Sequence, residues 1–344
     1  MRFSAVCPTV VDAEPKLDET ARFCHVCGTP AVTATPTTKP IATKRRRSFY
    51  VLPVVLLIAV LVSAIVISAL FVLPFYPVHF NQTHKVPKAD VNHLLLEFQT
   101  DVAQVNVFFE NMPNNMAALS VTADDNVGIL DDPNRAVNVT FSYQTTNNSQ
   151  AVSASVSRAT ILPILFNLNV NCDIYIDPST SLTLHARSSV GNIVMDADAN
   201  VTLQILDLET TTGSVDVSLS KGVVIADFVT LHTSTGTVHF KMDEADVLGG
   251  GSVELRSTTG SVNVDLAALQ RLSGNVTVNA RTTTSSVNLS MAIDGDVGAR
   301  IESETVVGGI KVDVQRFSGN QSPIQSSNYP AGSNFLVDLK TTTG

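Results

Sequence analysis

A short turn recurs at a nearly constant interval through the last two thirds of the chain. Successive turns are 22 to 25 residues apart, and after each one the second, fourth and sixth residues are apolar. The third and fifth residues are polar, with Val194 as the exception. An interval in this range indicates a repeat architecture, and an alternation of period two places one face of a strand in a core and the other in water. The turn residues are Gly191, Gly213, Gly236, Gly260, Ser285 and Gly308.

One such repeat cannot bury its apolar face alone, so we expect each repeat to stack on the next, with equivalent residues about 4.8 Å apart. A second strand precedes each turn, and loops such as 248–251 absorb the variation in length. The predicted fold is therefore all-β, a parallel β-solenoid with coils of about 23 residues. Its core residues are Ile193, Met195, Ala197, Val215, Val217, Leu219, Val238, Phe240, Met242, Val262, Val264, Leu266, Val287, Leu289, Met291, Ile310, Val312 and Val314.

The residues around the turns carry further information. Thr and Ser residues precede most turns, where their hydroxyl groups can bond a neighbouring rung. Gly accepts a positive φ at the turn, which Ser285 must either adopt or avoid through a different turn. Taken in sequence order, the column four residues before each turn is not a stripe of one charge. It comprises Arg187, Glu209, His232, Arg256, Arg281, Glu304 and Lys340.

A long uncharged segment divides the chain. Residues 49 to 75 contain no charged residue and no Asn or Gln, and about 20 such residues span a bilayer as a helix. A secretory signal peptide would be shorter and nearer the N-terminus. The basic residues 44–47 directly precede the segment, which predicts a cytoplasmic N-terminus and an extracytoplasmic C-terminal domain in the cell membrane.

Charge separates the two sides of this segment. Residues 1 to 47 hold eight Lys and Arg against four Asp and Glu, a net charge of +4. Residues 77 to 344 hold fourteen against twenty-seven, a net charge of −13. An acidic exterior argues against nucleic acid as a partner. The expected partners are the lipid bilayer, a cell-surface polymer or protein, and further copies of the chain.

The N-terminal segment contains a cysteine knuckle, Cys24-His25-Val26-Cys27-Gly28, with Cys7 upstream. Residues 16 to 28 resemble the second half of the short zinc ribbons that begin many archaeal and bacterial membrane proteins. Those ribbons open with two cysteines, and here Val10 stands in the place of the second. The resemblance implies zinc held by Cys7, Cys24 and Cys27. His25 is a candidate fourth ligand in an awkward position, and a decayed ribbon or coordination shared between two chains are the alternatives.

The region between the apolar segment and the repeats is also β-like. Ala103 resembles a degenerate first turn, and residues 137–143 and 151–156 flank a predicted hairpin. We expect this region to cap the stack, which would otherwise expose an apolar layer and unpaired edge groups. At the other end, 339–344 repeats the approach to a turn, so we expect either a fragment or a strand supplied by another molecule. Cys172 is predicted to be a buried packing residue.

From about residue 95 onward the chain resembles the DUF4097-type adhesin domain, which is built from T-T-G-x-V-x-V-like repeats. The resemblance is most specific in the rows that begin at Thr210, and it implies a β-solenoid on a cell surface. The predicted organisation is a degenerate zinc ribbon (1–28), a flexible basic linker (29–47), a transmembrane helix (48–76), a membrane-proximal β region with the cap (77–180), and the β-solenoid repeats (181–344).

These features predict a structural and adhesive surface module without enzymatic activity. A sensor that couples external binding to the cytoplasmic ribbon is the alternative, and it requires an oligomer. A polysaccharide-active enzyme is a third hypothesis, because parallel β-helices host such enzymes. The outward Asp216, Asp265 and Asp313 do not occupy one column, however, and we interpret them as solvated strand residues.

Overall fold

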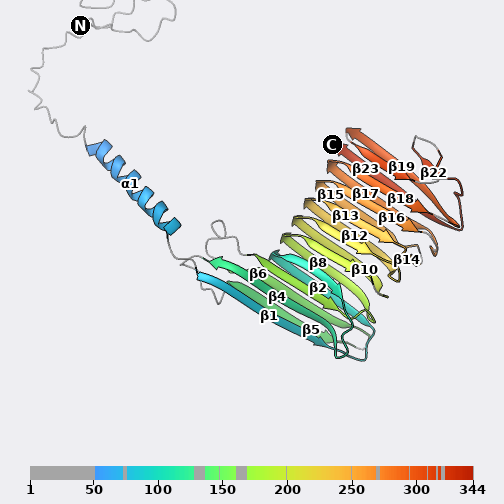
Figure 1. The fold of residues 1–344 in the computed structure, drawn as a ribbon, viewed down its shortest axis with the longest axis horizontal. Coiled ribbons are helices and arrows are strands. Elements are labelled where there is room, and N and C mark those ends of the chain that lie inside the picture. The colour runs from blue at the N-terminus through green and yellow to red at the C-terminus, as the bar shows by residue number, and fades with distance from the viewer. Residues whose placement is uncertain are drawn as a thin grey trace, which may run out of the picture. The chain divides into compact units, whose positions relative to one another are not determined.

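A computed structural model describes the chain from Val51 onward with short gaps: residues 51–72, 76–127, 136–146, 148–159, 169–198, 200–248, 250–268, 272–293, 295–307, 309–314, 317–318 and 322–343. The chain divides into two compact units, Met1–Phe71 and Val72–Gly344. Strands are the predominant secondary structure in the described part of the second unit, so the all-β expectation is confirmed (Figure 1). The described part of the first unit contains the helix α1, Val51–Val72. Among the described residues, no helix combines the length and the apolar character needed to cross a membrane.

The strands of the second unit form two sheets, and the chain alternates between them in the repeat region. One sheet has 10 strands and is parallel from β7 through β20. In sheet order its strands are β1 (Tyr76–Pro87), β4 (Asn115–Val127), β7 (Val170–Ile176), β3 (Gln104–Phe109), β9 (Ile193–Ala197), β11 (Val215–Leu219), β13 (Val238–Asp243), β16 (Val262–Ala268), β18 (Val287–Ile293) and β20 (Ile310–Val314).

The other sheet has 13 strands and is parallel from β19 through β6. In sheet order they are β21 (Phe317–Ser318), β22 (Ile324–Ser326), β19 (Val297–Val307), β23 (Ser333–Thr343), β17 (Val276–Thr284), β15 (Ser252–Thr259), β12 (Val224–Thr235), β10 (Thr202–Thr212), β8 (Ser181–Val190), β2 (His93–Val102), β6 (Gln150–Arg158) and β5 (Val137–Thr145), with β14 (Asp246–Val247) paired to β12.

The core forms where the predicted alternation puts it. All three predicted core residues are buried in every rung from the turn at Gly191 to the turn at Ser285. The last rung differs, because Ile310 and Val312 are only half-buried. They lie on β20, the last strand of the 10-stranded sheet, and no other described strand covers its outer edge. Val314 belongs to the same strand, and its side chain lies outside the described residues.

Close backbone contact at the turns holds the rungs together. Gly213 and Gly236 have φ values of 144° and 147°, which side chains rarely permit. A Cβ on Gly236 would stand 2.0 Å from the carbonyl oxygen of Gly213 in the preceding turn. Ser285 adopts the same conformation at φ 151° and therefore bears the strain. Gly308, the last predicted turn residue, lies outside the described residues.

The Thr and Ser residues before the turns have a specific role. The Thr233 hydroxyl is fully buried and donates to the carbonyl oxygen of Gly213 at 2.8 Å. This bond satisfies an acceptor on a backbone that packs too tightly to admit water. The same arrangement joins Thr210 to Gly191, Ser257 to Gly236, Thr282 to Gly260 and Thr341 to Ser285.

The strands before residue 181 continue both sheets beyond β8 and β9. Ala103 lies at a turn, because its amide donates to the carbonyl oxygen of Val190 as the later glycine amides do to their neighbours. The strands β2 and β3 on either side of it pair with β8 and β9 in parallel. The predicted hairpin is confirmed as the antiparallel pair β5 and β6. This hairpin extends the 13-stranded sheet beyond β2, and β7, β4 and β1 extend the 10-stranded sheet beyond β3, so a role as the cap of the stack stays a prediction.

The C-terminal strand does not lie at the end of its sheet. β23 pairs in parallel with β17 on one side and with β19 on the other. The order along the sheet therefore differs from the order along the chain, in which β19 follows β17. Both edges of β23 are therefore paired within the chain. The expectation at 339–344 concerns the strand that would follow a further turn, which these pairings do not test, so it stays a prediction.

We expect Gly236→Ala to lower the free energy of unfolding by about 2–4 kcal/mol, because the new methyl group would collide with the Gly213 carbonyl and carry a positive φ. Gly332→Ala is the matched control, since a Cβ there meets nothing within 4 Å. Urea unfolding followed by circular dichroism measures both, because the chain contains no Trp. Equal midpoints for the two variants would contradict the proposed role of the turn contact.

Candidate interaction surface

Polar side chains on the outer face of the 13-stranded sheet form columns across the strands. The parallel register aligns Arg187 with Glu209 and Glu209 with His232. The Arg187 guanidinium lies 3.2 Å from the Glu209 carboxylate, and His232 lies 3.5 Å from the same carboxylate. These pairs are partly exposed, so each contributes little to stability but keeps its side chain in the column.

The order of this column in space corrects the order expected from the sequence. His232 aligns with Arg256, Arg256 with Arg281, and Arg281 with Lys340 rather than with Glu304. Glu304 follows beyond Lys340, because β23 lies between β17 and β19. Three cationic side chains therefore occupy consecutive strands, which the sequence order does not indicate.

A groove of about 190 Å³ lies over these three strands. Its charged lining comes from Arg256, Arg281 and Lys340 and from Glu254, which is two residues before Arg256 on the same face. Thr283 and Thr342, which follow Arg281 and Lys340 by two residues on their strands, line its other side. The lining comprises Glu254, Arg256, Ser257, Arg281, Thr282, Thr283, Lys340 and Thr342.

The outer face of the 10-stranded sheet holds a smaller charged cluster around His239. The ring of His239 lies 3.0 Å from the Asp265 carboxylate and 3.8 Å from the Asp216 carboxylate. Burial raises the pKa of Asp216, His239 opposes that rise, and the neighbouring Asp196 carboxylate adds to it. Sequence reasoning placed Asp216 and Asp265 in separate columns and missed the histidine that joins them across three strands. The side chain of Asp313 lies outside the described residues.

A second hollow, of about 380 Å³, lies beside the loop between β3 and β4. Lys85, Glu110 and Tyr175 contribute polar groups to its lining. The Tyr175 ring stacks on Phe108 with 5.4 Å between ring centroids, and burial raises the pKa of its hydroxyl. Met112, Pro113 and Ala118 line the same hollow, so its surface is mixed and more apolar than polar.

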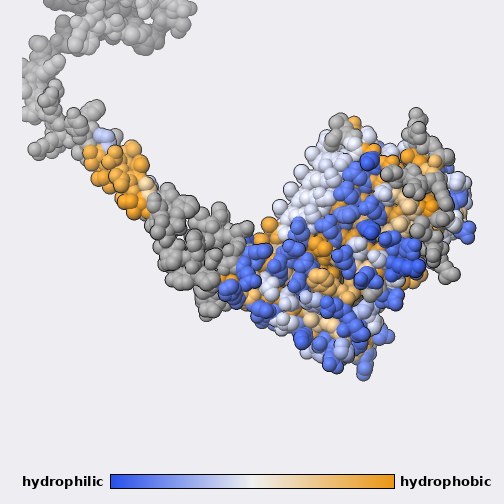
Figure 2. Space-filling view, in the orientation of Figure 1, coloured by the Kyte–Doolittle hydropathy of each residue, from blue (hydrophilic) through white to orange (hydrophobic). Residues whose placement is uncertain are grey.

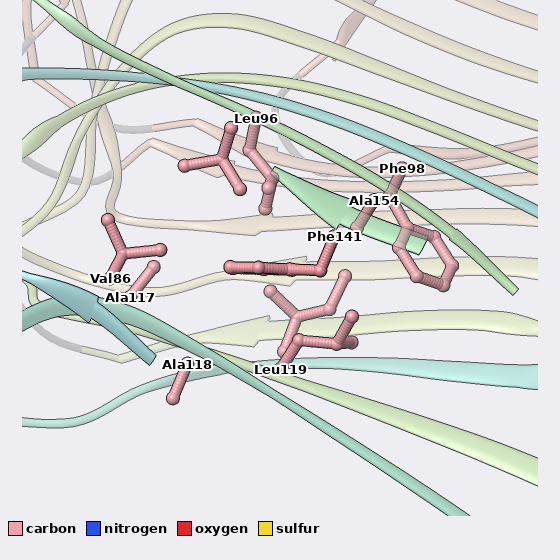
Figure 3. Close-up of a pocket in the computed structure, with 10 residues that line it drawn as sticks. Val86, Leu96, Phe98, Ala117, Ala118, Leu119, Phe141 and Ala154 are labelled. Carbon is pink, nitrogen blue, oxygen red and sulfur yellow. The ribbon is translucent and has the colours of Figure 1, made fainter. Parts of the chain in front are cut away.

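A third cavity lies between the two sheets near β4 and β6, and its lining contains no polar side chain. Its volume is about 10 Å³, too small for a ligand. Figure 3 shows Phe141 lying between Leu96 and Leu119, with alanine side chains around them. Every side chain in its lining is apolar, so it is a packing gap within the core.

The predicted metal ligands Cys7, Cys24 and Cys27 lie outside the described residues. Within the residues that the structure does describe, no group of three or more His, Cys, Asp or Glu side chains is arranged to hold a metal ion. Zinc at the three cysteines therefore stays a prediction from the sequence.

Cys172 has the buried position that its strand pattern predicts. It lies on β7 with no exposed surface. Burial, with a further contribution from the Asp173 carboxylate, raises the pKa of its thiol from 9.0 to about 12. A neutral thiol is a poor nucleophile and metal ligand, so Cys172 acts as a small apolar side chain in the core.

We expect iodoacetamide at pH 8 to leave Cys172 unmodified in the folded protein and to alkylate it after denaturation. Because the folded-state pKa lies above the unfolded value, the stability gained by keeping the thiol neutral is present below pH 9 and is lost as the pH rises towards 12. Mass spectrometry of the peptide that contains Cys172 measures the modification. Equal labelling rates in the folded and denatured protein would show that the thiol is accessible.

Comparison with known proteins gives similarity to solved structures alone. No family model matches the chain, and no curated protein matches its sequence. A proposed cell adhesion protein from Clostridium sporogenes aligns with a TM-score of 0.41 and 13% identity, over 77% of this chain and 96% of that one. A proposed adhesin from Bacteroides fragilis aligns with a TM-score of 0.29 and 13% identity, over 77% and 95% of the two chains. A proposed adhesin from Parabacteroides distasonis gives 0.27 and 12%, over 76% and 97%.

Proposed function

We propose that this chain is a single-pass membrane-anchored surface protein, and that its two sheets form a parallel β-solenoid acting as a structural and adhesive module. One observation carries the proposal. The parallel register places polar side chains in continuous columns on the outside of both sheets, over a core that is almost fully buried. Such a surface presents polar groups at a regular spacing on consecutive rungs, which suits a partner with a repeating structure.

The hollows on this surface favour binding over catalysis. General acid–base catalysis requires titratable groups converging on one reacting atom. The groove across β15, β17 and β23 is lined by side chains in ladders, and the cavity between the two sheets is apolar. None of the three hollows described above is lined by the cluster around His239.

The sequence around α1 supports membrane anchoring. Residues 49 to 75 carry no charge, and the basic residues 44–47 precede them. Large apolar side chains in the described part of α1 are exposed, with Leu56 and Leu57 each at 63%. Figure 2 shows this part of the helix in the colour of hydrophobic residues. A bilayer would remove these side chains from water, and the basic flank would keep the N-terminus in the cytoplasm.

The native cysteines allow a direct test of this topology. In intact cells, a membrane-impermeant maleimide should leave the wild-type protein unlabelled, because Cys172 is buried and the other cysteines would face the cytoplasm. The variant Thr258→Cys places a thiol at an exposed site on β15 and should be labelled. Peptide mass spectrometry identifies the modified residue.

The control is the same labelling after cell lysis, which should expose the N-terminal cysteines while Cys172 stays protected. Labelling of Cys24 or Cys27 in intact cells would contradict the proposed orientation. Adhesion is tested separately by incubating the purified full-length protein with cell-envelope polymers, and failure to retain any of them would contradict the adhesive role.

A further inference from the structure

The insertion of β23 creates a cationic stripe inside an acidic domain. Arg256, Arg281 and Lys340 lie on adjacent parallel strands in direct register. Neighbouring strands are about 4.8 Å apart, and like charges directly opposite each other destabilise a sheet. The arrangement therefore has an energetic cost unless an anionic group offsets it.

The chain neutralises this stripe only in part. The Arg281 guanidinium lies 3.2 Å from the Asp338 carboxylate, and the Lys340 ammonium donates to Glu304. Within the described residues, Arg256 has no acidic partner in ion-pair contact. The guanidinium of Arg256 is exposed at the wall of the groove, and its planar fork is available to a bidentate oxyanion.

The rest of the groove is not purely cationic. Glu254 lines it on one side of the stripe, and the hydroxyl groups of Thr283 and Thr342 line the other side. Carboxylates accept hydrogen bonds from hydroxyl groups, and threonine hydroxyls both donate and accept. A ligand that fits this lining carries one oxyanion together with several hydroxyl groups.

We propose that this groove binds the acidic sugar residues of a carboxylate-bearing polysaccharide. The sugar carboxylate binds Arg256 and Arg281, while its ring hydroxyl groups bind Glu254 and the two threonines. A partner with only closely spaced anionic groups, such as polyphosphate, fits poorly, because Glu254 and Asp338 would repel it. This inference rests on the proposed adhesive function and gives the chemical class of the polymer that the surface recognises.

Calorimetric titration of the full-length protein in detergent micelles with an oligogalacturonate tests the proposal. Methyl-esterified oligogalacturonate is the matched probe, because esterification removes the charge and keeps the sugar ring. We expect the free acid to bind and the ester to bind with an affinity at least roughly tenfold lower, since hydrogen bonds to charged groups are the stronger ones. Added NaCl should weaken the binding of the free acid.

Arg256→Gln should weaken oligogalacturonate binding by roughly tenfold. The variant breaks no ion pair within the described residues, so its unfolding midpoint should stay close to that of the wild type. Lys221→Gln removes one positive charge outside the groove, where Lys221 pairs with Glu244, and should leave binding unchanged.

Three outcomes would overturn the proposal: no binding of oligogalacturonate, equal binding of the free acid and the ester, or full binding by Arg256→Gln. Displacement of the sugar by an equal concentration of inorganic phosphate would also overturn it, because the groove would then be a general oxyanion site. Retention of envelope polymers by both the wild type and Arg256→Gln would leave the adhesive role intact and show that this groove does not provide it.

Discussion

The close stacking of one turn on the next is the constraint on which the rest of this structure depends. Gly236 approaches the Gly213 carbonyl so closely that a Cβ would stand 2.0 Å from its oxygen, and the buried Thr233 hydroxyl donates to that same oxygen. These contacts fix the register between strands. Once the register is fixed, residues with the same position in each repeat lie in columns. Alternate columns then face the core and the solvent.

The columns explain both the core and the surface. Inward columns of Val, Leu, Ile, Met and Phe exclude water between the two sheets, and outward columns place charged groups on consecutive strands. Figure 2 shows the result on one face, where hydrophilic residues predominate and hydrophobic residues form small patches. The same geometry therefore supports a long stack and places polar side chains at a regular spacing along one direction. It connects the fold to the adhesive role that we propose.

The sequence predicts the features that depend on local pattern. Alternation after each turn identifies the buried residues, the Thr and Gly residues locate the turns, and the hairpin of β5 and β6 follows from its flanking strands. The place of β23 could not be predicted, because Thr341 before its end has the same local pattern as Thr282 in β17, and only long-range pairing decides which strands are neighbours. The partial exposure of Ile310 and Val312 could not be predicted either, because their local pattern is that of an interior rung and only the strand order shows that they lie at the end of a sheet. For the site, the charged residues were visible but their order in space, and the contacts of His239, were not.

The position of β23 between β17 and β19 is therefore the central claim, and an engineered disulfide tests it most directly. In the structure Asn279 is paired with Asp338, while Glu302 lies one strand farther on. Adjacent strands bring two cysteines within bonding range, whereas two strand spacings, about 9.6 Å, exceed the limit of about 7 Å between Cα atoms. Oxidation should cross-link Asn279→Cys with Asp338→Cys, identified by peptide mass spectrometry, and should leave the pair Asn279→Cys with Glu302→Cys reduced. Cross-linking of the second pair and not the first would show that β17 contacts β19 directly, and would remove the basis of the cationic groove.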